Sequence, residues 1–205
     1  MSAEISAKSG SPLPWLEHAI FALDAWLRRR QGIYEYTTDP QCLFRIARCR
    51  ADQAVRLADG TLVRAGDPLI ELHLWNENMP AMGLEGPTVG WAHRVSRSIQ
   101  ASLRELAEYL ARERSLDGVA VVCGDMQLGS PRQTEQLAHI VARYGFETQA
   151  GGCGGHGILH RFGKSLLVLL LVAATNPIAL RSAVLRPYHK RVFLSRATLE
   201  RRYGT

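Results

Sequence analysis

The chain has 205 residues, of which 46% are hydrophobic and 21% are charged. This length suits one domain with or without an appendage, and the composition excludes a long disordered protein. No stretch reaches the roughly 20 consecutive apolar residues of a membrane-spanning helix, and the first residues lack the basic-then-apolar order of a signal peptide. We therefore expect a cytoplasmic protein, with or without peripheral contact to a membrane.

The net charge of +6 belongs to one end of the sequence. The segment from Arg181 to Thr205 contains seven basic residues and one acidic residue, and the rest of the chain has no net charge. A nucleic-acid partner is therefore not expected, because its footprint would spread basic residues over a larger part of the chain. Nearly all basic residues are arginines, which suits recognition of phosphate or carboxylate groups or reflects a GC-rich genome.

The four cysteines form no CxxC pair, so neither a zinc site nor a thioredoxin-like motif is predicted. We expect free thiols in a reducing compartment and no bound metal.

The first half of the chain predicts a helix followed by antiparallel strands. Residues 1–11 are expected to form a flexible N-terminus. Apolar residues at helical spacing then predict a helix over residues 15–30, which ends before Gly32. Alternating patterns predict strands at 42–51, on both sides of the hairpin signal Asp59-Gly60, and at 69–75 after a turn at 65–68.

The second half of the predicted domain alternates helices and strands. Residues 76–90 form a loop rich in glycine and proline, and a helix runs from Trp91 to about Arg114 with an apolar stripe at Ala92, Val95, Ile99, Leu103, Leu106 and Leu110. The run VAVVCG at 119–124 predicts a strand buried on both faces. A helix that starts at Ser130-Pro131 follows, with a stripe at Leu137, Ile140, Val141 and Tyr144, and then a short strand at 146–150. The predicted fold class is α/β, with a mixed, largely antiparallel sheet flanked by helices.

The C-terminal part adds a glycine-rich connector at 151–157, an apolar stretch at 166–180 and a strand followed by a helix capped by Ser195. As a helix, the apolar stretch would measure about 22 Å, which is short of a hydrocarbon core of about 30 Å. We expect an extra apolar helix, packed on the domain of residues 12–150, in a homodimer interface or at a membrane surface.

The richest polar cluster lies where the strand at 69–75 enters the loop. Alternation places Glu71 and His73 on one strand face, where either could act as a general base. We take Glu71, His73 and Glu77 as candidate catalytic residues. The candidate substrate-binding residues are Trp75, Asn76 and Asp125. The alternative is that Glu71 and His73 lie on a half-exposed strand without a chemical role.

A second candidate site is the loop GLEGPTVG directly before the long helix. Glycine-rich backbone before a helix offers N–H groups and the positive end of the helix dipole to a phosphate. The candidate cofactor-binding residues are Gly86, Thr88, Gly90 and Arg94. A plain loop is the alternative, because no GxGxxG or GxxxxGK[ST] pattern occurs.

The order of elements over residues 12–150 resembles the GCN5-related N-acetyltransferase fold, whose last helix typically ends in a Gly-Phe pair that enters a strand, as Gly145-Phe146 do here. The stretch VRLADGTLVRAGDPLIELHLWNENMP also resembles the YkoP-type bacterial domain, an uncharacterised group with this kind of fold. The acetyltransferase resemblance implies an acyl-CoA co-substrate whose pyrophosphate lies near Gly86 to Gly90, and a base at Glu71 or His73 on the preceding strand.

Two functions follow as expectations. The first is an acyltransferase-like domain that binds an acyl-CoA or similar phosphate-bearing ligand and transfers the acyl group to an amine or hydroxyl. The alternative is a non-catalytic accessory protein that associates with a membrane surface or a protein partner through its C-terminal apolar helix and basic tail.

Overall fold

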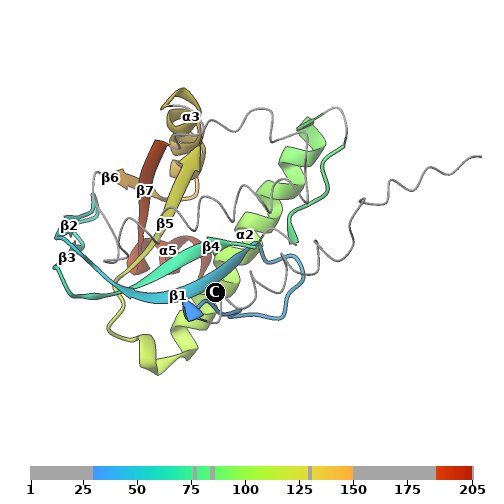
Figure 1. The fold of residues 1–205 in the computed structure, drawn as a ribbon. Helices are drawn as coiled ribbons and strands as arrows, with labels where there is room; N and C mark the ends of the chain where they lie inside the picture. Colours follow the sequence, from blue (N-terminus) through green and yellow to red (C-terminus); the bar gives the residue numbers. More distant parts are fainter. Residues whose placement is uncertain (1–29, 76–77, 84–85, 129–130, 150–187, 205) are drawn as a thin grey trace, which may run out of the picture.

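The computed structural model describes residues 30–75, 78–83, 86–128, 131–149 and 188–204. Its main sheet has five strands (Figure 1) in the order β1 (Phe44–Arg50), β4 (Pro68–Leu74), β5 (Val121–Leu128), β7 (Tyr188–Ser195) and β6 (Glu147–Gln149). Strands β4 and β5 are parallel, and the other neighbouring pairs are antiparallel. The predicted mixed, largely antiparallel sheet is therefore confirmed.

The described helices pack on one face of this sheet. They are α2 (Val89–Arg112), α3 (Pro131–Ala142) and α5 (Arg196–Tyr203), with a short 3-10 turn, η2 (Arg114–Leu116), after α2. All three share one apolar core with that sheet face. Two predicted elements lie outside the described residues: the helix at 15–30, except for Arg30, and the apolar stretch at 166–180. None of the described helices packs on the opposite face of the sheet.

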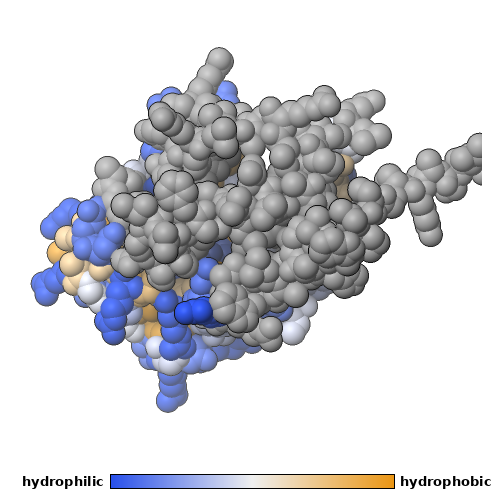
Figure 2. Space-filling view, viewed as in Figure 1, coloured by the Kyte–Doolittle hydropathy of each residue, from blue (hydrophilic) through white to orange (hydrophobic). Residues whose placement is uncertain are grey.

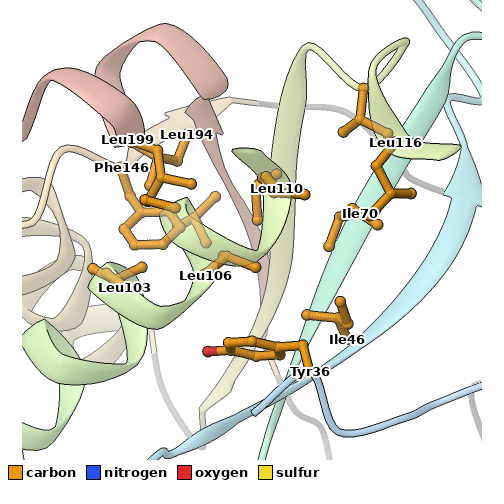
Figure 3. Packing of buried hydrophobic residues seen from close by; sticks show 14 of the residues in the cluster. Tyr36, Ile46, Ile70, Leu103, Leu106, Leu110, Leu116, Phe146, Leu194 and Leu199 are labelled. Carbon is orange, nitrogen blue, oxygen red and sulfur yellow. The ribbon is translucent and has the colours of Figure 1, made fainter. Parts of the chain in front are cut away.

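Helix α2 supplies the centre of the core. Leu103, Leu106 and Leu110 are fully buried. In Figure 3, Leu106 and Leu110 lie toward Ile46 of β1 and Ile70 of β4, while Leu103 lies beside Phe146. The predicted stripe is confirmed in this half of the helix. In the first two turns of α2 the predicted stripe is wrong at Ala92, which is exposed. Within the described structure the buried positions of this helix begin at Ser98.

Helix α3 packs less deeply than its pattern predicts. Leu137, Ala138 and Val141 are partly buried against the core, whereas Ile140 is 49% exposed. At 100° per residue, Ile140 falls about 100° from the centre of the face that these three residues define. The prediction that Ile140 belongs to the buried stripe is therefore wrong.

The predicted hairpin at Asp59-Gly60 is present on the opposite face of the sheet. Strands β2 (Val55–Arg56) and β3 (Leu62–Val63) pair across it, and Gly60 has a φ of 89°, which favours glycine. The hairpin packs on the sheet residues Leu69, Val121 and Phe193. At this end of the molecule apolar and hydrophilic surface lie side by side (Figure 2).

Asp59 joins this hairpin to the start of α5. The Ser195 hydroxyl donates a hydrogen bond to Asp59 Oδ2, and the Thr198 hydroxyl donates to the same oxygen over 3.3 Å. Ser195 Oγ also accepts from the Thr198 N–H, so the predicted N-cap at Ser195 is confirmed. The hydrogen bond from the Ser195 hydroxyl, followed by that from the Thr61 N–H, lowers the pKa of Asp59 to about 2.

A second buried polar cluster fixes the approach to β1 against α2. The Tyr36 hydroxyl donates to the Ser102 carbonyl over 2.8 Å, and Ser102 Oγ accepts from the Leu43 N–H over 2.8 Å. Ser102 Oγ itself donates to the Ser98 carbonyl, so its hydroxyl is fully used. Burial raises the pKa of Tyr36 well above its ordinary value, which keeps the phenol protonated as a donor.

Strand β7 lies inside the sheet, between β5 and β6, so residues 188–203 are an integral part of this fold. Two arginines of this segment bind other parts of the same fold. Arg196 donates to the carbonyls of Leu110 and Leu116, and Arg191 forms an ion pair with Asp125. The described cysteines, Cys42, Cys49 and Cys123, are not in disulfide bonds, as predicted.

Candidate functional site

The central feature of the candidate site is the divergence of the parallel strands β4 and β5. They pair only at Ile70↔Val122, Glu71↔Cys123 and Leu72↔Gly124. Beyond that point β4 stays with β1 as far as Leu74, while β5 stays with β7 as far as Leu128. The carboxyl ends of the two strands therefore separate, and in open α/β sheets such an edge is where ligands commonly bind.

Glu71 and His73 lie at this edge, as the alternation of the strand predicts. Ile70 belongs to the core beneath the helices, while Leu69 belongs to the hairpin core, so Glu71 and His73 point to the face opposite α2. Glu71 Oε2 lies 3.7 Å from His73 Nε2, and only 9% of Glu71 is exposed. The structure thus brings together a carboxylate and an imidazole, two groups that can exchange a proton with a substrate.

Asp125 shares this face, because Glu71 pairs with Cys123 and Asp125 is two residues further along β5. Its carboxylate is bound by Arg191 on β7, with 2.6 Å between Arg191 Nε and Asp125 Oδ1 and a second contact of 3.3 Å from Nη2. This two-pronged geometry orients both side chains and neutralises the aspartate. Asp125 therefore acts first as the partner of Arg191.

Trp75 lies beside a cation. The Arg45 guanidinium carbon is 4.1 Å from the centre of the Trp75 ring, and Arg45 Nη2 is 3.1 Å from Glu35 Oε1. Arg45 is opposite His73 in the antiparallel register, so it stands on the same face. Arg45 and Arg191 were not among the predicted site residues. A single arginine in the apolar run CLFRIA was a signal for Arg45, but nothing local marked Arg191.

The residues of the second predicted site lie around the start of α2. Thr88 is the N-cap, with its Oγ1 accepting from the Trp91 N–H over 3.2 Å, and Gly86 has a φ of 86°. Arg94 folds back over this turn, since a β-carbon on Gly90 would lie 3.9 Å from Arg94 Nη1. Gly86, Thr88, Gly90 and Arg94 are therefore grouped around one helix end.

In the first turn of α2, two backbone N–H groups have no acceptor among the described residues. Among the described residues, no protein group accepts from the N–H of Val89 or of Gly90. Two free amides at the positive end of a 24-residue helix, with an arginine above them, suit a phosphate group. The predicted residues Asn76 and Glu77 lie outside the described residues.

The loop between β4 and α2 is anchored at two described points. Asn78 Nδ2 donates to the Cys42 carbonyl over 2.8 Å, and the Trp91 indole N–H donates to the Pro80 carbonyl over 2.9 Å. These bonds hold the loop against the start of β1 and against α2. Trp91 is consequently a structural residue of the loop.

The profile of the YkoP domain matches residues 23–203 of this chain, which is most of its length. The chain belongs to the YkoP domain family. No curated protein and no solved structure matches the chain. In the part of the YkoP domain that the structure describes, no group of three or more His, Cys, Asp or Glu residues could hold a metal ion. Among the described helices, none has the length and apolar character needed to cross a membrane.

Proposed function

We propose that this YkoP domain binds an acyl-CoA, or a similar phosphate-bearing thioester, at the carboxyl edge of β4 and β5 and transfers the acyl group to an amine or hydroxyl. The observation that carries the proposal is the divergence of this parallel pair at Leu72↔Gly124, with Glu71 and His73 beside it. The helix that connects the two strands, α2, begins at Val89, after the loop that follows Leu74.

The strand order supports the acetyltransferase-like arrangement that the sequence resembles. An antiparallel pair leads into β4, a loop feeds the long helix α2, and β5 returns parallel to β4. Gly145 has a φ of 98° and joins α3 to the strand that follows Phe146. A Gly-Phe pair that turns a helix into a strand is typical of the acetyltransferase fold, which supports the proposal.

The phosphate end of the ligand fits the start of α2. The amides of Val89 and Gly90 would donate to pyrophosphate oxygens, and the Arg94 guanidinium would add charge. The acyl end would then extend toward the diverging strands. This arrangement uses both predicted sites for one ligand.

The chemistry requires one base and a polarised carbonyl. Glu71 or His73 would remove the proton of the acceptor amine or hydroxyl as its nitrogen or oxygen attacks the thioester carbon. Backbone N–H groups would stabilise the developing oxyanion. The carbon–sulfur bond then breaks, and the CoA thiolate leaves with a proton from the protonated base or from water.

This chain departs from the acetyltransferase pattern at two places. The loop GLEGPTVG lacks the family's Q/R-x-x-G-x-G/A pattern, and Val141 stands where the family often has a tyrosine that protonates the thiolate. Tyr144 does not replace it, because its hydroxyl donates to Ser96 Oγ over 2.9 Å. The proposal therefore depends on the base itself, or on water, to protonate the thiolate.

Ligand binding is tested by thermal-shift titration of the full chain with CoA, acetyl-CoA and a long-chain acyl-CoA. Saturable stabilisation is expected, and at a ligand concentration of 100 times Kd it amounts to about 2.7 kcal/mol. Arg94→Gln should weaken binding, whereas Arg112→Gln, at the far end of the same helix, should not. The absence of any shift with all three compounds would overturn the proposal.

Transfer is tested by CoA release from acetyl-CoA in the presence of a mixture of amines and alcohols. Glu71→Gln and His73→Gln are expected to lower turnover at least tenfold, each with binding of CoA retained. The control is Glu135→Gln, which changes an exposed carboxylate on α3. Equal turnover in all variants would remove Glu71 and His73 from the reaction.

A further inference from the structure

Several arginines on the helix side of the molecule lack carboxylate partners. They are exposed, and in the described part of the chain no Asp or Glu oxygen lies within 4.0 Å of them. By contrast, Arg45, Arg191 and Arg196 each pair with a carboxylate. The arginines without a carboxylate partner in the described structure include Arg94, Arg97 and Arg104 on α2, Arg143 after α3, and Arg201 and Arg202 on α5.

Three of these arginines lie on elements that contact one another, and we call them the arginine cluster: Arg104, Arg143 and Arg202. Arg202 Nη1 donates to the Arg143 carbonyl over 3.1 Å. The Tyr203 hydroxyl donates to the Tyr144 carbonyl over 3.1 Å, so the end of α5 lies against the turn that follows α3. Helix α2, which carries Arg104, packs against α5.

The remaining arginines of α2 extend this charge along the helix. Arg94 and Arg97 are one turn apart on the exposed side of α2, and Arg104 is two turns further on. At 1.5 Å per residue the distance from Arg94 to Arg104 along the helix axis is about 15 Å. The buried residues of α2 lie on its opposite side, so the arginines face outward.

Like charges that are gathered without counter-charges repel one another, and an anionic partner would remove that repulsion. Guanidinium groups in particular fit phosphate oxygens with paired hydrogen bonds. We propose that the outer face of α2 and α5, centred on the arginine cluster, docks on an anionic phospholipid surface. This goes beyond the proposed acyl transfer, whose base residues lie on the other face of the sheet.

A lipid surface fits these residues better than a nucleic acid does. Single strands are bound where exposed aromatic rings stack on bases beside basic groups. Here the aromatic neighbours are half-buried and their hydroxyls are occupied, since Tyr203 donates to the Tyr144 carbonyl and Tyr144 donates to Ser96. An anionic bilayer surface attracts positive charge spread over an exposed face of a protein and needs no exposed aromatic rings.

The test is sedimentation of the full chain with vesicles of phosphatidylcholine containing 30% phosphatidylserine, compared with vesicles of phosphatidylcholine alone. Binding only to the anionic vesicles, and its loss in high salt, is expected. Each arginine near such a surface contributes about fivefold in affinity. The triple variant Arg104→Gln, Arg143→Gln, Arg202→Gln should therefore bind about 100-fold more weakly.

The matched control removes the same charge elsewhere. The triple variant Arg48→Gln, Arg50→Gln, Arg64→Gln changes three exposed arginines near β1 and the hairpin and should bind like the natural chain. A second set, Arg104→Lys, Arg143→Lys, Arg202→Lys, keeps the charge and should retain most of the binding, which separates charge from folding.

Three results would overturn the proposal. The first is no binding to anionic vesicles. The second is equal weakening in both glutamine triple variants, which would mean that only net charge matters. The third is binding of a labelled single-stranded oligonucleotide, but not of vesicles, that is lost in the cluster variant. Failure of acyl-CoA binding would leave this result unaffected, because the two assays use different ligands and different variants.

Discussion

The contact between Asp59 and Ser195 predicts how stability depends on pH. Asp59→Asn keeps a side-chain oxygen that can accept from the Thr61 N–H, as Asp59 Oδ1 does over 2.9 Å. It removes the negative charge that the Ser195 and Thr198 hydroxyls bind. The variant should therefore separate the bond between hairpin and helix from the local turn.

The magnitude follows from the pKa. A value of about 2, against an ordinary value of 3.8, corresponds to at most about 2.4 kcal/mol of stabilisation by the charged form. Asp59 is exposed, so solvent screening reduces this to about 1 kcal/mol. Because the pKa is lowered on folding, the stabilisation is complete above the ordinary pKa and disappears as the pH falls through about 2.

Urea unfolding followed by circular dichroism at pH 7, 4, 3 and 2.5 measures this. The free energy of unfolding of Asp59→Asn should be lower than that of the natural chain by about 1 kcal/mol at pH 7, and this difference should shrink below pH 4. Asp52→Asn, an exposed aspartate in the segment between β1 and β2, is the control. A difference that stays constant down to pH 2.5 would refute the reasoning, since it could not come from the charge.

Three further substitutions test the core and the backbone by the free energy of unfolding. Leu106→Ala should cost about 2–5 kcal/mol because it leaves a cavity at a fully buried position, and exposed Ile140→Ala should cost no more than about 0.5 kcal/mol; equal costs would contradict the core described here. Tyr36→Phe should cost about 1 kcal/mol for the hydrogen bond to the Ser102 carbonyl, and an unchanged stability would show that this bond contributes nothing. Gly145→Ala should cost about 2 kcal/mol, since φ is 98° and the added carbon would lie 3.2 Å from Leu194 and Thr198. Gly118→Ala is the control and should be tolerated, because its added carbon meets only Pro68, at an ordinary contact distance of 3.7 Å.

Local signals accounted for much of this fold. Asp59-Gly60 marks its hairpin and Ser195 caps its helix because a turn and a cap depend on a few neighbouring residues. The period of two placed Glu71 and His73 on one face for the same reason. Within α2, however, the pattern could not tell that the described core begins only at Ser98.

Contacts between distant segments could not be predicted in this way. Arg191 reaches Asp125 only because β7 lies beside β5, and Ser195 reaches Asp59 only because the hairpin folds over that end of the sheet. A single sequence records neither strand order nor which face a hairpin covers. The partners of Asp125 and Asp59 were therefore visible only in three dimensions.

The place of β7 has a consequence for how the chain is made in the cell. Among the described strands, β6 pairs only with β7, and β7 follows all the others in the sequence. Until residues 188–195 have left the ribosome, one side of β5 and both sides of β6 have no partner among these strands. An exposed strand edge of this kind is prone to pair with other chains. We expect nascent chains that stop before residue 188 to need chaperone protection, and the sheet to close in one late step after synthesis.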